Sequence, residues 1–418
     1  MNELSRCCLM ADENSKKTYW LINQYASTPE SGMGGRHYYL AKELAKQGHR
    51  VYLIGAGFTH LLRQPPRLVE EFTVEPIAEG FNFVWIKVPE YSGAHDKKRV
   101  LNWIRFAWKL LTLPKVIADK PDAILYSSPA LIPFLGAQRL AKKFKAKLAF
   151  EVRDIWPLSL VELGGFSKKH PFILLMQWVE DKAYRDADVV LSNLPKAVDH
   201  MVIRGMRQDK FTWIPNGFDL AELESTQKLD ERSRKALPKD KFIVGYTGTL
   251  GVANALDSLI DAASLLQKDT DINFVLVGGG KEKAGLVEKA KDLNNVIFID
   301  SIPKQQIQSM LMEFDICYIG WKKDPIYRFG IAPNKLPEYM FSSRPIVHAY
   351  SGINDFVEIA NAGLSIPAED PQAIVKAVLK LKAMSLEQRQ KMGENGRIYA
   401  LEHHDYAKLA QKLEQVLS

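Results

Sequence analysis

The chain alternates between short apolar runs and longer amphipathic segments, and this alternation constrains its fold more than any other feature. It starts after Thr18 with YWLIN, GRHYYLAKELAKQG and HRVYLIG, and it continues as far as DVVLSN, which ends at Asn193. Apolar runs of about four to six residues between segments of helical periodicity are typical of βαβ units with a parallel sheet. The pattern therefore predicts a doubly wound α/β domain.

A second series of the same kind follows a charged stretch from Glu222 to Lys241 and contains FIVGYTGTL, INFVLVGGG, NVIFID, ICYIGW and RPIVHAY. A chain of 418 residues is also too long for one comfortable core, so two domains are expected. We predict a disordered tail over residues 1–17, a first domain over 18–215 and a second over 216–400, with a last helix over 401–418 crossing back to the first domain. The two domains would face each other across a cleft, with ligands at the carboxyl ends of both sheets.

The excess of basic residues lies entirely in the first half of the chain. Residues 1–200 contain 28 Lys plus Arg against 21 Asp plus Glu, and residues 201–418 contain 28 of each, which accounts for the net charge of +7. This asymmetry favours an anionic partner, either a phosphorylated acceptor or an acidic membrane surface, and no nucleic-acid-binding motif accompanies it. Three cysteines without a C-x-x-C pair, and no apolar segment of signal-peptide or membrane-span length, indicate a cytoplasmic protein.

The stretch from Phe329 to Val347 has the strongest features of a ligand site. Pro333 and Asn334 predict a helix start, with the Asn side chain as the cap, so that the helix begins near Lys335. Lys335 and Glu338 then share one face. The cation and the backbone N–H groups could hold phosphate, and the carboxylate could hold a ribose diol. An ordinary surface Lys–Glu pair is the alternative.

Glycine-rich turns follow three of the predicted strands. Such turns let the backbone approach a ligand closely and direct N–H groups at an anion, although each could also be a plain tight turn. The spacing in SGMGGR is not G-x-G-x-x-G, so a dinucleotide site is not supported. The candidate residues are Gly248 and Thr249 in GYTGTLG, Gly278 and Gly279 in VGGG, and Gly34, Gly35 and Arg36 as an acceptor or phosphate loop.

The sequence EVRDIWP, residues 151–157, directly follows a predicted strand, where doubly wound folds place their chemistry. Asp154 could orient or deprotonate a hydroxyl group, and Arg153 could hold a phosphate or carboxylate with its guanidinium fork. No metal site is predicted, because the nine histidines lack ligand spacing. The DAD triplet at 186–188 is interpreted as a helix end.

The segment from Lys97 to Val116 combines basic residues with Trp103, Phe106 and Trp108 on an amphipathic helix. Aromatic and basic residues together suit a membrane interface. Burial of the same aromatic rings against the sheet is the alternative.

These motifs resemble those of family 4 of the retaining glycosyltransferases, whose GT-B fold consists of two Rossmann-like domains. The resemblance extends from Tyr19 over nearly the whole chain, and it is carried by GMGGRHYYLAKEL, EVRDIWPLSLVELGG, WIPNGFD, GYTGTLG and PNKLPEYMFSSRPIV. The second and the last of these motifs look most similar to the bacterial branch that includes N-acetyl-L-fucosamine transferases of O-antigen and capsule assembly.

The resemblance assigns roles to particular residues. Two glutamates eight residues apart are usual in the family: the first contacts the donor sugar and the second holds the ribose. Glu338 matches the second glutamate, and Gly330 stands where the first is expected. The usual basic pair of the phosphate loop is missing from GTLGVAN, so Lys335 is expected to replace it, with Arg328 as a second candidate. Ile331 and Asn334 complete the expected donor-binding set.

The resemblance implies an enzyme that transfers a sugar, expected to be N-acetylated, from a UDP-sugar to a lipid-linked glycan intermediate of bacterial surface polysaccharide. Lys335, Arg153 and Asp154 are the expected catalytic residues, no metal or other cofactor is required, and contact with the cytoplasmic face of the membrane is expected through Lys97–Val116. A sugar-nucleotide epimerase on the same fold and an NAD-dependent oxidoreductase are alternative hypotheses. A non-catalytic scaffold is a third, because Gly330 replaces a carboxylate.

Overall fold

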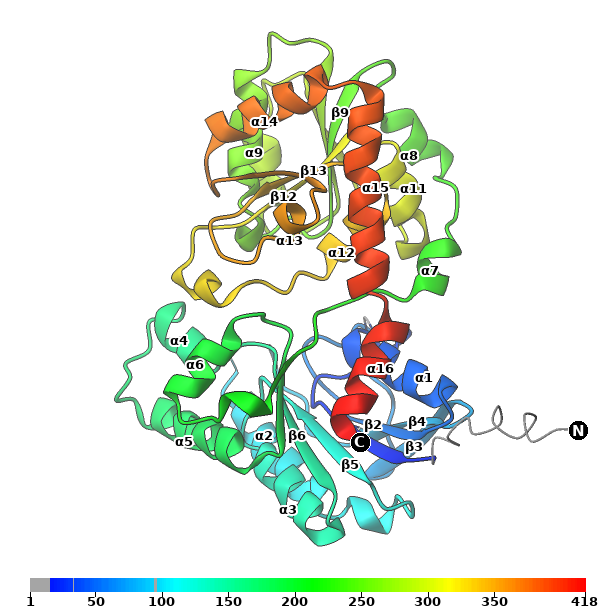
Figure 1. Ribbon diagram of the computed structural model, residues 1–418, viewed down its shortest axis with the longest axis vertical. Coiled ribbons are helices and arrows are strands. Elements are labelled where there is room, and N and C mark those ends of the chain that lie inside the picture. The colour runs from blue at the N-terminus through cyan, green and yellow to red at the C-terminus, as the bar shows by residue number, and fades with distance from the viewer. Residues whose placement is uncertain (1–15, 33, 94–95) are drawn as a thin grey trace, which may run out of the picture. The chain divides into compact units, whose positions relative to one another are not determined.

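The computed structural model describes residues 16–32, 34–93 and 96–418 (Figure 1). The predicted tail over 1–17 lies outside these residues, apart from its last two positions. The chain forms two compact units. The first comprises the chain up to Glu151, Leu174–Leu191 and Leu413–Ser418, and the second comprises Val152–Ile173 and Ser192–Lys412. The domain limits expected from the sequence, 18–215 and 216–400, stay a prediction.

The first sheet has eight strands in the order β3-β4-β2-β1-β5-β6-β7-β8. Strand β1 pairs in parallel with β2 and β5, and β5 with β6, whereas β3 runs antiparallel to β4. The bounds are β1 Thr18–Ile22, β2 Arg50–Ala56, β3 Phe72–Ala78, β4 Phe81–Ile86, β5 Ala123–Ser127, β6 Lys147–Val152, β7 Val189–Ser192 and β8 Phe211–Trp213. The central strands are buried on both faces, as their continuous apolar sequences predict.

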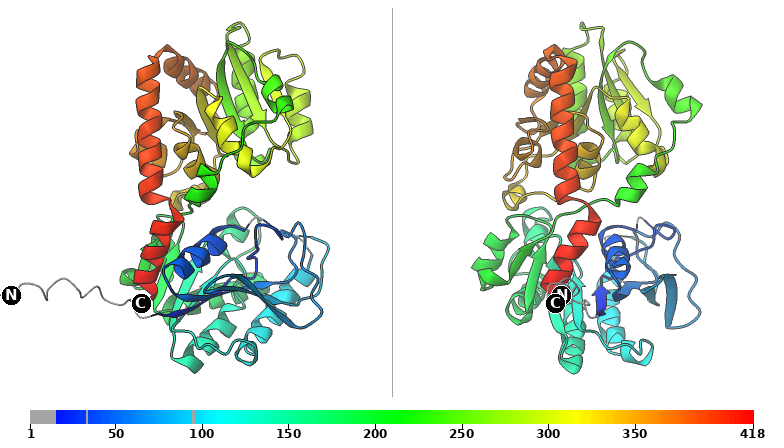
Figure 2. Two further views of the ribbon diagram at one scale, coloured as in Figure 1. Left: turned by 90° about the vertical axis from the view of Figure 1, so that its right-hand side faces the viewer. Right: turned by 45° about the vertical axis from the view of Figure 1, so that its right-hand side comes forward.

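Helices cover both faces of this sheet. The connection from β1 to β2 runs toward one edge of the sheet, whereas the connections from β4 to β5, from β5 to β6 and from β6 to β7 run toward the other edge. Because such connections are right-handed, the helices of these two groups lie on opposite faces of the sheet. The left view in Figure 2 shows this arrangement. The helices are α1 Arg36–Lys46 on one face and α2 Lys98–Leu110, α3 Phe134–Phe144 and α5 Pro171–Asp186 on the other, with the short α4 Leu158–Glu162 and α6 Ala197–Ile203.

The second sheet has six strands, all parallel, in the order β11-β10-β9-β12-β13-β14. Its strands are β9 Phe242–Thr247, β10 Ile272–Val277, β11 Val296–Ile299, β12 Ile316–Gly320, β13 Ile346–Ala349 and β14 Gly363–Ile366. Its helices are α7 Leu220–Glu224, α8 Glu231–Ala236, α9 Leu256–Leu265, α10 Lys283–Lys289, α11 Ile307–Met312, α12 Lys335–Phe341, α13 Phe356–Ile359, α14 Pro371–Ala383 and α15 Leu386–His403.

Side chains alternate between two apolar cores along these strands. Val275, Val277 and Ile319 belong to one core, and Phe274 and Leu276 belong to the other. This alternation follows from the two-residue period of a strand. Helix α12 contributes its apolar face to the first of these cores, which fixes the direction of its polar face.

The C-terminal helix predicted over 401–418 is present as α16, but it begins later than predicted. Helix α15 ends at His403, and α16 begins at Tyr406 and ends at Leu417. Between them, the backbone of His404 and Tyr406 exchanges hydrogen bonds with Phe218, which forms an isolated parallel bridge with Asp405. Gly217 is required here, because an added Cβ would lie 2.2 Å from the His404 carbonyl oxygen.

The side chain of His404, in the break between α15 and α16, is buried. Its ring Nδ1 lies 2.7 Å from the carbonyl oxygen of Asn216, so Nδ1 carries the proton and donates it to this bond. Burial lowers the pKa of His404 to about 4, with the Asn216 bond opposing the shift. The ring is therefore neutral at physiological pH.

Replacing His404 with Gln should reduce the acid sensitivity of the fold. A lowered pKa means that the unfolded chain binds more protons below about pH 6.5, so this group makes unfolding easier by about 2 kcal/mol at pH 5 relative to pH 7. Urea unfolding at the two pH values measures the difference for wild type and variant. His403→Gln is the matched control, because the side chain of His403 is largely exposed. An equal pH dependence in wild type and His404→Gln would contradict the assignment.

Candidate functional site

The candidate site lies where the topology of the second sheet reverses. After β9 the chain returns toward β10 and β11, and after β12 it continues toward β13 and β14. The loops that leave the neighbouring strands β9 and β12 therefore diverge, which opens a crevice at the carboxyl ends of these strands. The loop after β9 carries Gly248 and Thr249, and the segment after β12 leads to α12, which begins at Lys335 as predicted.

The Lys335 ammonium group lies in this crevice. Its Nζ donates to the hydroxyl oxygen of Tyr246 at 2.7 Å and to Oδ1 of Asn254 at 3.0 Å. It also lies 4.4 Å from the centre of the Tyr246 ring, over the negative face of the ring. An added Cβ on Gly248 would come within 3.1 Å of Nζ, so the glycine loop and the cation are in contact.

All of these contacts are made by neutral groups. Among the described residues, Lys335 forms no ion pair with a carboxylate. Burial lowers the pKa of Lys335 to about 8, because the ammonium form loses hydration without gaining an opposite charge. The group is still mostly protonated at neutral pH. An anion placed in this crevice would supply the missing counter-charge, so the arrangement suits a phosphate or diphosphate.

The glycine loops are held together by close backbone contacts. Gly248 and Gly278 have φ angles of +136° and +147°, which strongly favour glycine. A Cβ on Gly278 would lie 2.0 Å from the carbonyl oxygen of Gly248, and a Cβ on Gly280 would lie 2.2 Å from that of Leu250. Gly279 keeps the loops paired, because its carbonyl oxygen accepts the N–H of Leu250 at 2.8 Å. The two predicted loops therefore form one surface.

Glu338 lies one helical turn after Lys335 and is half-buried. In the part of the chain that the structure describes, its carboxylate accepts no hydrogen bond, although its backbone oxygen accepts one from Gln308 at 2.9 Å. Burial raises the pKa of the Glu338 carboxyl, and Lys304 partly opposes this shift. A partly desolvated carboxylate with unused acceptor positions can hold the hydroxyl groups of a ligand.

Asn334 does not cap α12 as predicted. Its backbone is already helical, and no side-chain cap bond is present. Instead, its Oδ1 accepts a hydrogen bond of 3.0 Å from Nδ2 of Asn216, which also donates to the carbonyl oxygen of Ala332 at 2.8 Å. This pair of bonds fixes the segment that leads into α12, next to the buried Ile331.

Gly330 has a φ angle of +87°, a conformation that side chains rarely adopt. A Cβ at this position would also lie 2.6 Å from Cδ of Pro195. The backbone path therefore explains why no glutamate occupies this position.

Arg328 belongs to a different contact. Its two terminal nitrogens donate to the carboxylate of Glu162 at 2.7 and 2.8 Å. The guanidinium fork is therefore already engaged by a carboxylate. Of Lys335 and Arg328, the two candidates for replacing the missing basic pair, only Lys335 lies against a glycine loop without a carboxylate partner among the described residues.

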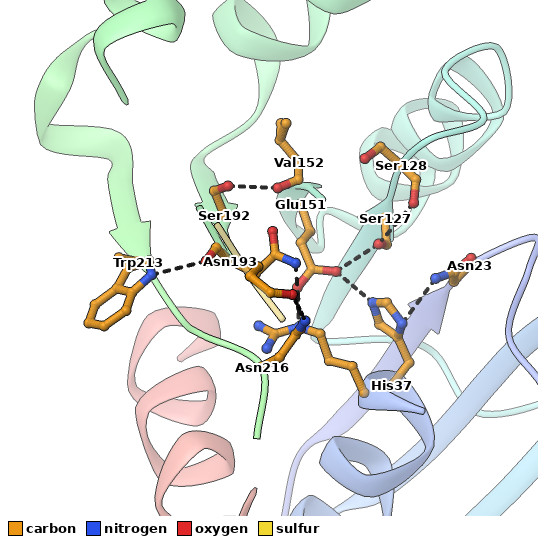
Figure 3. A network of polar contacts seen from close by, with 12 residues as sticks. Asn23, His37, Ser127, Ser128, Glu151, Val152, Ser192, Asn193, Trp213 and Asn216 are labelled. Carbon is orange, nitrogen blue, oxygen red and sulfur yellow. Dashed lines mark hydrogen bonds and ion pairs between the residues drawn. The ribbon is translucent and has the colours of Figure 1, made fainter. Parts of the chain in front are cut away.

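The predicted acceptor loop of the first unit is built on a buried carboxylate. Glu151 is fully buried and accepts hydrogen bonds from Arg36 Nε at 2.8 Å, His37 Nε2 at 2.6 Å and Ser127 Oγ at 2.7 Å. Figure 3 shows His37 between Glu151 and Asn23. Gly34 and Gly35, with φ angles of +65° and +86°, lead directly into this network. Arg36 is thus paired with Glu151, and its role toward a phosphate stays a prediction.

Asp154 and Arg153 follow in the second unit. The Asp154 carboxylate is accessible to solvent but closely surrounded by protein, and desolvation raises its pKa, with Arg153 opposing the shift. A raised pKa is a property that a proton-accepting carboxylate can use. The catalytic roles of both residues stay predictions.

Two partners of Lys335 were not identified from the sequence. Tyr246 stands inside the strand in GYTGTLG, where its aromatic ring reads as a core residue, yet its hydroxyl reaches the rim and donates to the carbonyl oxygen of Thr249 at 2.7 Å. Asn254 follows the same loop and donates to the same oxygen at 2.9 Å. The sequence signal that could have identified both residues is the presence of polar groups within and just after a glycine loop.

Two family models match the chain. "Glycosyl transferase 4-like domain" covers residues 31–217, and "Glycosyl transferases group 1" covers residues 241–384. Together with the two parallel-sheet α/β units, these matches place the chain among the group 1 glycosyltransferases with a GT-B fold, and it is a transferase enzyme.

A curated relative from Escherichia coli K12 is 26% identical over 316 residues, which are 71% of this chain and 74% of the relative. Its name gives it, provisionally, as a colanic acid biosynthesis glycosyl transferase, WcaI. Similar solved structures include sucrose-phosphate synthase from Thermosynechococcus elongatus, with a TM-score of 0.71 at 17% identity over 96% of this chain and 98% of that chain. The Anabaena protein HepE, in complex with UDP and glucose, has a TM-score of 0.64 at 16% identity over 96% and 99%. At these identities the structures show the shared fold.

Two properties of the described residues bear on partners. No three or more His, Cys, Asp or Glu side chains in this part of the chain are grouped so that they could hold a metal ion. None of the helices described here has the length and apolar character needed to cross a membrane.

Replacing Gly278 with Ala should destabilise the second unit. The new Cβ would meet a backbone oxygen in a conformation that L-residues rarely adopt, and we expect unfolding to become easier by about 2 to 4 kcal/mol. Gly285→Ala is the matched control, because nothing lies within 4 Å of a Cβ there and Ala favours the helix by up to about 1 kcal/mol. Urea unfolding compares the two variants. Similar stability of both would contradict the close contact between the loops.

Proposed function

We propose that this glycosyltransferase moves a sugar, N-acetylated in our hypothesis, from a UDP-sugar to a hydroxyl group of a lipid-linked glycan intermediate of bacterial surface polysaccharide. The single observation that carries the donor side of this proposal is the Lys335 ammonium, which lies against the Gly248 loop without a carboxylate partner. Polysaccharide assembly is supported by the colanic acid assignment of the E. coli relative, and a uridine nucleotide by the UDP in the HepE complex.

In the proposed reaction, the oxygen of the acceptor hydroxyl forms a bond to the anomeric carbon while the bond from that carbon to the diphosphate oxygen breaks. Attack and departure occur on the same face of the sugar, so the anomeric configuration is retained. A phosphate oxygen of the departing diphosphate takes the proton of the acceptor. The protein then contributes chiefly by orienting the two substrates and by stabilising the charge that develops on the diphosphate.

Each proposed site residue has one task in this scheme. Lys335 and the backbone N–H groups of the glycine loops hold the diphosphate, so no divalent ion is needed. Glu338 accepts hydrogen bonds from the ribose hydroxyls. Asp154 orients the acceptor hydroxyl, and Arg153 binds an anionic group of the acceptor.

Replacing Lys335 with Met should weaken UDP binding by about 10- to 150-fold, which corresponds to the 1.5 to 3 kcal/mol of a charge-assisted hydrogen bond. Calorimetric titration of UDP in a buffer that contains a chelator tests this together with the metal-free proposal. In wild type, UDP affinity should fall as the pH rises above about 8, because the free site loses its ammonium charge there, whereas the variant should show no such dependence.

Lys380→Met is the control, because Lys380 is an exposed lysine of α14 to which no other described residue gives a hydrogen bond or an ion pair. Equal UDP affinity in wild type and Lys335→Met would remove this residue from the site. Binding that appears only when a divalent ion replaces the chelator would show that the metal-free scheme is wrong.

The role of Glu338 can be tested with UDP and 2′,3′-dideoxy-UDP. Wild type should prefer UDP by at least about tenfold, since removal of the diol leaves a partly buried carboxylate without partners, and Glu338→Ala should lose this preference. The quantity measured is the change in the ratio of the UDP and 2′,3′-dideoxy-UDP affinities between wild type and Glu338→Ala. Glu358→Ala, at an exposed position of α13, serves as the control. An unchanged preference in Glu338→Ala would place the ribose elsewhere.

A further inference from the structure

Helices α2, α3 and α5 lie on one face of the first sheet; α3 packs against α2, and a hydrogen bond links it to the end of α5. Gly136 of α3 is so close to α2 that an added Cβ would lie 2.6 Å from the carbonyl oxygen of Ala107. Gln138 of α3 donates to the carboxylate of Asp186, at the end of α5, at 2.8 Å. The three helices lie together on the side of the sheet opposite α1 (Figure 2). Their outer faces are therefore on the same side of the first sheet.

The outer face of α2 is apolar. Trp103 and Phe106 are buried toward the sheet. For these two rings the alternative of burial is therefore correct, and they are not available to a membrane. Leu101, Ile104 and Trp108 follow the same helical spacing on the other side, and they are 52%, 52% and 71% exposed. A helix that is apolar on both sides has one face to which the rest of the described chain gives no partner.

Helix α5 repeats this arrangement. Its inner face carries the buried Met176 and Val179, while Leu174, Leu175 and Trp178 are 56%, 45% and 54% exposed. Each of the two outer helices thus exposes two aliphatic side chains and one tryptophan. Grouped apolar side chains on an outer surface mark an interaction site more often than single ones do.

The central helix α3 exposes a basic stripe between these two apolar stripes. Arg139, Lys142 and Lys143 are its exposed side chains. The sequences of α2 and α3 contain seven Lys or Arg residues, namely Lys98, Arg99, Arg105, Lys109, Arg139, Lys142 and Lys143, and no Asp or Glu. Lys109 is paired with Glu71 at 3.1 Å, and α5 carries Glu180, Asp181 and Asp186 beside Lys182 and Arg185, so the excess of positive charge belongs to α2 and α3. The layer therefore combines positive charge with exposed tryptophan.

We propose that the outer faces of α2, α3 and α5 form a docking surface for an anionic lipid bilayer. Tryptophan and leucine side chains insert at the boundary between headgroups and acyl chains, and lysine and arginine attract anionic headgroups. A second copy of the chain fits less well. In a symmetric dimer the central α3 would face its own copy, which would bring two basic stripes together.

This inference deepens the proposed function, because a lipid-linked acceptor is presented at such a bilayer surface. Docking on a membrane, however, requires neither UDP nor turnover. The two can therefore fail separately in an experiment: vesicle binding without UDP binding counts against the donor site alone, and UDP binding without vesicle binding counts against the docking surface alone.

The test is co-sedimentation of the full chain with vesicles of phosphatidylcholine alone or of equal parts phosphatidylcholine and phosphatidylglycerol. Wild type should bind the anionic vesicles and bind them more weakly at high salt. Neutralising Arg139, Lys142 and Lys143 to Gln should weaken binding by about 100-fold, from about fivefold per basic residue. Exchanging Trp108 and Trp178 for Gln should weaken binding to a similar extent, and all the changed side chains are exposed, so folding should persist.

The controls carry changes of the same kind on the second unit. Leu265→Gln and Ile398→Gln remove exposed apolar side chains, and Lys380→Gln and Lys391→Gln remove exposed charges. Circular dichroism and the shift of the thermal midpoint by UDP confirm that each variant is folded. Unchanged vesicle binding in both sets of variants would overturn the proposal. So would a self-association, seen by light scattering, that the same substitutions abolish.

Discussion

The first unit depends on the fully buried negative charge of Glu151. The Glu151 carboxylate accepts hydrogen bonds from the side chains of Arg36 and His37 in α1 and of Ser127 at the end of β5. A buried ion is stable only when its partners are complete, and removal of one partner leaves an uncompensated charge. This requirement ties the glycine turn before α1 to the carboxyl ends of β5 and β6. Arg153 and Asp154 therefore begin from a fixed point in the fold.

The cation of the second unit, Lys335, differs from Glu151 because it has no partner of opposite charge among the described residues. Lys335 is half-buried, and within the described part of the chain its ammonium contacts only neutral oxygen atoms and an aromatic ring. The fold gains little from such an arrangement, because the lowered pKa records a net cost of keeping the charge. Perturbed groups of this kind concentrate at functional sites. The contrast between a fully paired carboxylate and an unpaired ammonium separates the residues that hold the fold from those available to a ligand.

The sequence was sufficient where structure depends on local pattern. The two series of apolar runs became two sheets, and α12 begins at Lys335, because strand and helix periodicities are properties of neighbouring residues. It was insufficient where distant residues decide. Asn334 does not cap α12, because its side chain accepts a hydrogen bond from Asn216, which is 118 positions away. The helical break at His404 coincides with backbone hydrogen bonds to the distant Phe218. Glu151 reads as part of a catalytic motif until Arg36, 115 positions earlier, is seen beside it.

Gly330 and Lys335 are linked by the path of the backbone between β12 and α12. The φ angle of +87° at Gly330 turns the chain, and the two hydrogen bonds from Asn216 then hold Ala332 and Asn334. That course delivers Lys335 to Tyr246 and to the Gly248 loop. A glutamate held in this conformation at position 330 would cost about 1 to 3 kcal/mol, and its Cβ would lie 2.6 Å from Cδ of Pro195. The backbone path that brings the Lys335 ammonium to the glycine loop is therefore one that disfavours a glutamate at position 330.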